Sequence, residues 1–167
     1  RHLELNVLGE VVDRLTVDMG TVEVSAPVPV EAAGERFTVV PANAGNPHGV
    51  IFCEDPEAVE LERLGPLLER HPGLGERRNI EFVSCPDRGH LTVRVWERGS
   101  GITLACGTGA CAAFAAALAE NRCGDWVEAA LPGGTLTLER RGDRVFMTGP
   151  ARAVFEGEIP GSIKITA

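Results

Sequence analysis

The sequence has no run of about 20 apolar residues, which excludes a membrane-spanning helix. It has no excess of basic residues either: the net charge is −8 and the pI is about 5.0, which argues against nucleic acid or an anionic membrane as a partner. The five cysteines show no Cys-x-x-Cys spacing, so neither a zinc site nor a disulfide framework is expected. The first residues lack the pattern of a signal peptide, and a reducing cytoplasm is the expected setting.

A chain of 167 residues can form one domain or two small lobes with a real hydrophobic core. Hydrophobic residues make up 44% of it, which is ordinary for a globular protein. The chain has no initiator methionine and opens inside a strand-like pattern, so we interpret Arg1 as a cut edge rather than a natural start.

Short alternating segments bounded by glycine, proline and asparagine predict many β-strands. Pro27 and Pro29 restrict residues 25–30 to an edge or a loop, because proline lacks the N–H that a central strand needs. The expected strands are residues 3–7, 11–19, 37–40, 50–53, 80–84, 91–96, 126–131, 134–139, 144–148, 152–155 and 159–165.

Two segments predict helices. Asp55 and Pro56 are typical of a helix start, and apolar residues recur at helical spacing from Glu57 to Arg70. An alanine-rich segment from Cys106 to about Arg122 predicts a second helix, which Gly124 would end. So apolar a helix should be buried nearly all round inside a curved sheet, which predicts an α+β fold: a mostly antiparallel sheet wrapped around this central helix.

The second helix begins at a Cys-Gly-Thr-Gly turn, residues 106–109. The free N–H groups and the positive dipole end of a helix stabilise negative charge, so we expect a lowered pKa for the Cys106 thiol and room for an anionic ligand group. Gly107 and Gly109 leave the backbone amides uncovered. The alternative is a tight strand-to-helix connection around a buried, inert cysteine.

Polar residues lie where loops meet predicted strands. Asn46 and His48 precede one strand and Asn79 precedes another, so each is a candidate for binding or proton transfer, the alternative being a solvated loop. Glu97 and Arg98 follow a third strand and are able to hold the two charged ends of an amino acid. A surface turn with a charge pair is the alternative there.

Several motifs occur in one order: Gly-Asn-Pro-His at 45–48, Arg-Asn at 78–79, Trp-Glu-Arg-Gly at 96–99, Ala-Cys-Gly-Thr-Gly-Ala at 105–110 and Leu-Pro-Gly-Gly at 131–134. From about Val17 onward the sequence resembles diaminopimelate epimerases. The resemblance implies the carboxyl-terminal lobe of a two-lobed fold, in which each lobe is a β-barrel-like sheet around a central helix. It also implies an enzyme of lysine and peptidoglycan precursor synthesis that interconverts LL- and meso-diaminopimelate. No cofactor, pyridoxal phosphate or metal is implied.

By the same resemblance, Cys106 is a catalytic cysteine that His48 and Glu97 assist. The implied substrate-binding residues are Asn46, Asn79, Glu97, Arg98, Gly107 and Thr108, the last standing where some relatives have serine. Removing an α-proton without an electron-sink cofactor needs a base at the carbon and stabilisation of charge on the carboxylate. A thiolate beside helix amides offers both.

The family's opposing cysteine belongs to an amino-terminal lobe, and no other cysteine here is a substitute. We expect residues 1–19 to be the end of that lobe, residues 20–154 the carboxyl-terminal lobe, and residues 155–167 a strand returning toward the missing lobe. The expected partners are diaminopimelate, the amino-terminal lobe and a second copy in a homodimer. A proline or hydroxyproline racemase, a phenazine-type isomerase and a non-catalytic amino-acid-binding or assembly module are the alternatives.

Overall fold

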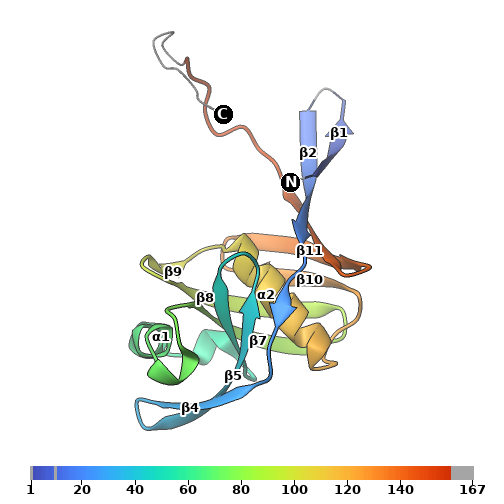
Figure 1. Cartoon of the computed structure of the whole chain (residues 1–167). Coiled ribbons are helices and arrows are strands. Elements are labelled where there is room, and N and C mark those ends of the chain that lie inside the picture. Colours follow the sequence, from blue (N-terminus) through green and yellow to red (C-terminus); the bar gives the residue numbers. More distant parts are fainter. Residues whose placement is uncertain (1, 10, 159–167) are drawn as a thin grey trace.

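The computed structural model describes residues 2–9 and 11–158, and these form a curved, 12-stranded mixed sheet with helices on both faces (Figure 1). The strands are β1 (Leu3–Leu8), β2 (Val11–Gly20), β3 (Glu23–Val24), β4 (Val28–Ala32), β5 (Glu35–Asn43), β6 (Pro47–Phe52), β7 (Asn79–Asp87), β8 (His90–Glu97), β9 (Gly101–Thr103), β10 (Trp126–Leu131), β11 (Gly134–Arg141) and β12 (Arg144–Pro150). The α-helices are α1 (Leu61–Glu69) and α2 (Gly107–Ala119), and the short 3₁₀ helices are η1 (Pro56–Ala58) and η2 (Pro72–Leu74).

The sheet is open rather than closed into a barrel. Its strand order runs β1-β2-β12-β11-β10-β8-β7-β6-β5-β3, with β4 beside β5 and β9 beside β8, so β1 and β3 are its two ends. Most neighbours are antiparallel, as expected, but β6 with β7 and β8 with β10 are parallel. The prediction of an α+β sheet around a helix is confirmed, while its barrel-like closure is not found.

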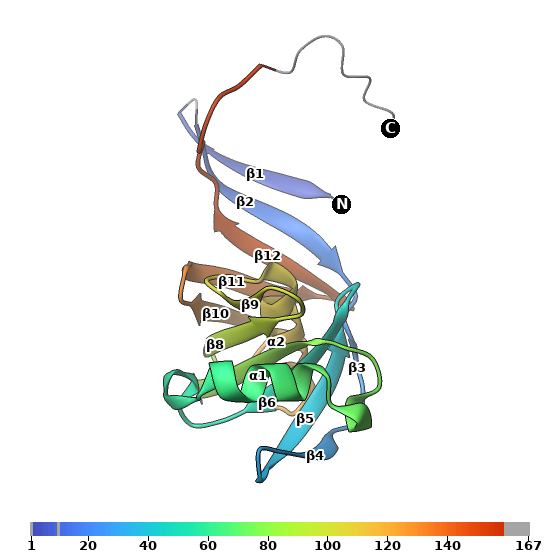
Figure 2. The ribbon, with the colours of Figure 1, turned by 90° about the vertical axis from the view of Figure 1, so that its left-hand side faces the viewer.

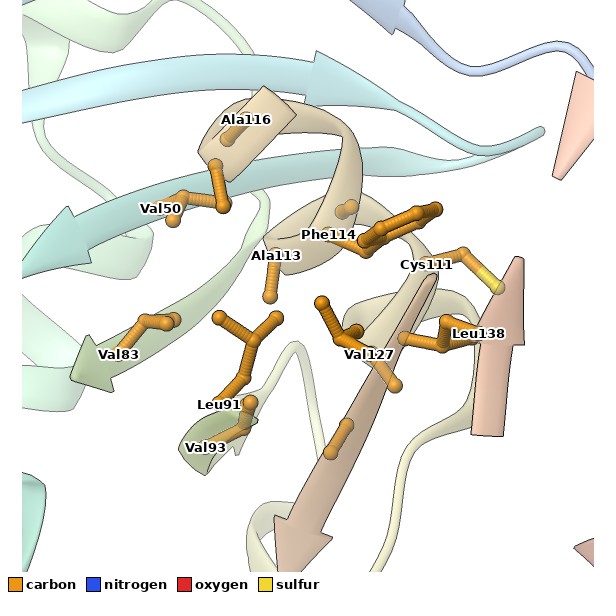
Figure 3. Close-up of a cluster of buried hydrophobic side chains, with 14 of the residues drawn as sticks. Val50, Val83, Leu91, Val93, Cys111, Ala113, Phe114, Ala116, Val127 and Leu138 are labelled. Atoms are coloured by element: carbon orange, nitrogen blue, oxygen red, sulfur yellow. The ribbon is translucent and has the colours of Figure 1, made fainter. Parts of the chain in front are cut away.

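Helix α2 lies inside the curve of the sheet, and residues from Gly109 to Ala117 are all buried. Phe114 and Cys111 point from the helix toward strand residues such as Leu91, Val127 and Leu138 (Figure 3). Alanine makes this close packing possible, because its small side chain lets neighbouring backbones approach and adds no polar atom to the core. The predicted all-round burial of this helix is confirmed.

The opposite face of the sheet carries a second apolar cluster under α1, with Leu61, Leu64 and Leu68 packed against Ile80 and Phe82. Strand β7 is therefore covered on both faces, and its residues Asn79 to Val83 are all buried. Figure 2 shows α1 on the outside of these strands, away from α2. A polar side chain in this part of β7 must find its partners inside the protein.

Several predicted boundaries are wrong. Asp55 and Pro56 begin the short η1 rather than α1, which starts at Leu61. Helix α2 ends at Ala119 because Asn121 adopts a left-handed conformation (φ 54°), so Gly124 is not its stop. Residues 28–32 form an edge strand. Residues 152–155 form no strand, and the predicted strand 159–165 lies outside the described residues.

The β1–β2 hairpin extends beyond the body of the fold, together with residues 151–158 (Figures 1 and 2). Leu3, Leu5 and Val7 alternate along β1 with more than half of their surface exposed. Strand β2 joins this hairpin to the body, since it pairs with both β1 and β12. Among the described residues, no helix is long and apolar enough to cross a membrane.

Candidate active site

Cys106 is the N-cap of α2, and its sulfur replaces the usual oxygen as the capping acceptor. The backbone N–H of Gly109 donates to Sγ at 3.3 Å, and the Thr108 hydroxyl lies 3.5 Å from the same sulfur. The carbonyl of Cys106 accepts from the N–H of Ala110. The N–H groups of Gly107 and Thr108 begin the helix and have no intrahelical acceptor, so they form a local site for negative charge.

Burial raises the pKa of the Cys106 thiol above its ordinary value. The hydrogen bonds from Thr108 and Gly109 lower the pKa, but the negative charges of Glu81 and Glu97 raise it further. The expected lowering of this pKa is therefore wrong for the described chain, because only 7% of the residue is exposed and two carboxylates lie near it. The helix end stabilises a thiolate without making it the dominant form at neutral pH.

His48 is fully buried at the start of β6, so it is not a solvated loop residue. Its Nδ1 lies 2.7 Å from Oε1 of Glu81, and its Nε2 lies 3.0 Å from Oδ1 of Asn46. The two ring nitrogens are thus both engaged. The ring therefore connects Glu81 on the buried strand β7 with Asn46, the residue just before β6.

Glu81 is a site residue that the sequence analysis missed. It is fully buried, its Oε2 has no hydrogen-bond partner among the described residues, and burial raises its pKa despite the neighbouring His48. The charge of Glu97 also raises the pKa of Glu81, and the charge of Glu81 raises the pKa of Cys106. The signal was available: an acid stands inside the apolar run Ile80 to Val83, where solvated side chains are rare.

Asn79, Glu97 and Arg98 lie together where β7 and β8 end. Asn79 faces His48 across the parallel β6–β7 pair, and its Oδ1 accepts the backbone N–H of Arg98 at 2.8 Å. The hydroxyl of Thr103 donates to Oε1 of Glu97 at 2.5 Å. The guanidinium of Arg98 donates to the carbonyl of Arg77 at 3.1 Å, so this side chain lies beside the backbone just before β7.

A second buried acid, Glu69 at the end of α1, holds Trp96 near the end of β8. The indole N–H of Trp96 donates to Oε2 of Glu69 at 2.8 Å, and Arg77 donates to its other oxygen. Burial acts to raise the pKa of Glu69, but these hydrogen bonds outweigh it and hold that pKa below its ordinary value. Glu69 is therefore a charged anchor for Trp96, the residue that precedes Glu97.

The fold thus brings all the predicted site residues to one end of the β6, β7 and β8 strands, beside the first turn of α2. A cavity of about 660 Å³ lies elsewhere, on the α1 face of β5 and β6, where Phe37, Ile51 and Arg63 help to line it. None of the predicted site residues lines that cavity. The candidate site is therefore the group of residues around Cys106 and not this cavity.

A sequence model of diaminopimelate epimerase matches residues 40–154. The chain is 48% identical over 134 residues to a diaminopimelate epimerase of Nostoc punctiforme, covering 79% of this chain and 48% of that relative. It is 43% identical over 169 residues to one of Desulfitobacterium hafniense, covering 93% of this chain and 60% of that relative. The chain therefore spans about half the length of such relatives.

Solved structures share the fold. A hydroxyproline epimerase of Agrobacterium vitis, solved with bound trans-4-hydroxy-L-proline, aligns with a TM-score of 0.67 at 17% identity, covering 87% of this chain and 52% of its own. A probable proline racemase of Agrobacterium radiobacter aligns with a TM-score of 0.69 at 13% identity, covering 95% of this chain and 58% of its own. At these identities the likeness concerns the fold alone.

Proposed function

Because the chain belongs to the diaminopimelate epimerase family, we propose that it supplies the carboxyl-terminal half of an enzyme that interconverts LL- and meso-diaminopimelate. The observation that carries this proposal is the thiol of Cys106 at the N-cap of α2, beside the free amides of Gly107 and Thr108. The two diaminopimelate epimerases compared above match 79% and 93% of this chain at 48% and 43% identity. The reaction serves lysine and peptidoglycan precursor synthesis.

In the proposed mechanism, the Cys106 thiolate takes the α-proton of the substrate. The Cα–H bond breaks, its electron pair spreads onto the α-carboxylate, and the amides of Gly107 and Thr108 stabilise that charge. A thiol on the opposite face then gives its proton to Cα and becomes the thiolate. Because burial raises the pKa of Cys106, this residue is well suited to hold the proton as a thiol in the reverse direction.

The remaining site residues bind and orient the substrate in this proposal. Asn46 and Asn79 supply amide groups, while Glu97 and Arg98 hold the ammonium and the carboxylate of one amino-acid centre. Glu97 also tunes Cys106, since its charge raises the pKa of the thiol. We assign His48 a supporting role, because its ring is buried and both of its nitrogens already have partners.

The opposing thiol belongs to another part of the protein in this proposal. Cys111 and Cys123 are buried in the core around α2, and Cys53 packs against the cluster under α1. We propose that an amino-terminal lobe brings the second cysteine and covers Cys106. The exposed apolar side chains of the β1–β2 hairpin support such an association, and a homodimer is the further expected assembly.

We also propose a cytoplasmic location for the enzyme. All five cysteines are free thiols in the structure, and a two-thiol mechanism needs both catalytic cysteines reduced.

The test is exchange of the substrate α-proton in heavy water, catalysed by the full-length enzyme. We expect Cys106→Ala to abolish the interconversion of the stereoisomers and the exchange of the isomer whose α-hydrogen faces Cys106, and Cys85→Ala to retain both because Cys85 lies near the far end of β7. Exchange that survives with both stereoisomers in Cys106→Ala would refute the assigned base. If diaminopimelate raised the melting temperature of the wild type while no exchange occurred, the chain would be a binding module.

A further inference from the structure

We propose that Glu81 is a positioning residue, which acts through His48 to fix the side-chain amide of Asn46 so that its NH₂ group faces the carboxylate of the substrate. This inference rests on the proposed function and adds a residue to it. Glu81 does not touch the substrate, since it is fully buried behind the histidine ring.

The first step concerns the protons of the His48 ring, which lies between two oxygen atoms. Oδ1 of Asn46 is an amide oxygen and only accepts, so Nε2 of His48, 3.0 Å away, must carry a proton and donate it. On the other side, Oε1 of Glu81 lies 2.7 Å from Nδ1. Because Nε2 carries a proton, the His48–Glu81 pair holds two protons in all: either both ring nitrogens are protonated and Nδ1 donates to the carboxylate, or a protonated carboxyl donates to Nδ1 of a neutral ring.

The carboxyl group of Glu81 matters because a neutral histidine ring carries only one proton, on either Nδ1 or Nε2. With an apolar residue at position 81, that proton could occupy either nitrogen, and Nε2 would bear it only part of the time. With Glu81 present, a second proton is shared with Nδ1, so the proton on Nε2 stays. Burial, which raises the pKa of Glu81, favours retention of this shared proton.

The second step concerns the side-chain NH₂ groups of Asn46 and Asn79. Oδ1 of Asn46 is engaged by His48, and Oδ1 of Asn79 is engaged by the backbone N–H of Arg98 at 2.8 Å. No hydrogen bond between described residues uses either NH₂ group. Asn79 and His48 are register partners on β7 and β6, so both amides lie at the same sheet end. The site therefore offers two N–H donors, which match a carboxylate and not an ammonium group.

The third step concerns packing, which holds Glu81 in place. A Cβ at Gly109 would lie 2.9 Å from Oε1 of Glu81, so the first turn of α2 sits directly against the carboxyl group. Its Oε2 is buried without a partner among the described residues, an arrangement that is destabilising and calls for a functional reason. Fixing His48, and through it Asn46, is such a reason.

The kinetic test compares Glu81→Met with Glu81→Gln in the full-length enzyme. Methionine has a similar shape but no hydrogen-bonding group, and we expect KM for diaminopimelate to rise about tenfold or more, as for loss of one hydrogen bond to a charged group, with a smaller change in kcat. Glutamine can donate to Nδ1 and so retains the proton on Nε2, and KM should return close to the wild-type value. Val83→Ala, at another fully buried residue of β7, controls for a disturbance of the buried strand and should leave KM unchanged.

A merely structural role for Glu81 predicts a different result: a lower melting temperature for Glu81→Met and an unchanged KM for the folded fraction. That outcome would overturn the proposal, as would a Glu81→Gln variant as impaired as Glu81→Met.

A second measurement does not depend on catalysis. ¹⁵N–¹H NMR of the histidine side chains, with His48 assigned by its absence from a His48→Asn spectrum, should show a proton on Nε2 under the conditions of the kinetic assay. A ring that is protonated on Nδ1 alone would overturn the inference. If the enzyme epimerised no diaminopimelate, the proposed function would fail, while this spectrum would still decide whether Glu81 and His48 orient Asn46.

Discussion

Replacement of Gly109 by alanine tests the packing of the site most directly. Gly109 lies in the first turn of α2 and does not have a positive φ, so its backbone suits alanine. A Cβ there would, however, lie 2.9 Å from Oε1 of Glu81 and 3.1 Å from Sγ of Cys106. Both atoms are buried and hydrogen-bonded, so neither can move freely.

The effect on stability and the effect on activity should differ in size. Alanine in place of glycine stabilises a helix by about 0.5–1 kcal/mol, whereas overpacking a core costs about 1–3 kcal/mol, so Gly109→Ala should be destabilised by roughly 0–2.5 kcal/mol. The Cβ must also push the sulfur or the carboxyl group by a few tenths of an ångström. Because catalysis falls about a hundredfold for a displacement of about 1 Å, we expect kcat/KM to fall roughly tenfold or more.

The assay combines urea unfolding with α-proton exchange in the full-length enzyme. Gly149→Ala is the matched control, because its Cβ would lie 2.8 Å from Cδ2 of Leu136, an equally close contact in β12 that involves neither Cys106 nor Glu81. The control should lose stability and keep its kcat/KM. Wild-type kcat/KM in Gly109→Ala, or an equal loss in Gly149→Ala, would refute the claim that Gly109 is required for the arrangement of the thiol and the carboxyl group.

Three further predictions follow from charges and backbone geometry. The charge of Glu97 raises the pKa of Cys106, so Glu97→Gln should shift the pH midpoint of Cys106 alkylation downward; an unchanged midpoint would contradict this coupling. Burial raises the pKa of Glu81, so its contribution to stability is present below its unfolded-state pKa and is lost as the pH rises through the higher folded-state value. The unfolding free energy of Glu81→Gln relative to wild type should therefore increase from acidic to neutral pH in urea titrations, and a constant difference would argue against the raised pKa. Asn121 ends α2 with a φ of 54°, so Asn121→Ala should cost about 1–2 kcal/mol and Asn121→Gly much less; equal melting temperatures would show that the left-handed cap is unimportant.

Hydrophobic patterning determined much of the fold from the sequence. Strand β10 alternates in the expected manner, with Val127, Ala129 and Leu131 buried and the residues between them exposed. The alanine-rich α2 is buried on all sides because nothing on its surface needs water. Whether the sheet closes into a barrel could not be predicted in this way. Alternation shows which face of a strand is buried, but not how many neighbouring strands it has or where the sheet ends.

Local motifs also located the candidate site. Cys106 beside its glycines, and Asn46, His48, Asn79 and Glu97 at strand ends, were all recognisable because each stands at a junction between elements, where side chains and free backbone groups are accessible. The tertiary structure added how they meet: the parallel pairing of β6 with β7 sets His48 opposite Asn79.

Two features depended on tertiary structure alone. The pKa of Cys106 is raised rather than lowered, because burial and the charges of Glu81 and Glu97 exceed the local effect of the helix end. The full burial of Glu81 follows from the covering of β7 on both faces, by α2 on one side and α1 on the other, which the apolar run around Glu81 does not by itself specify. A sequence specifies local conformation and polarity through neighbouring residues, whereas burial and electrostatic environment arise from segments that lie far apart in the chain.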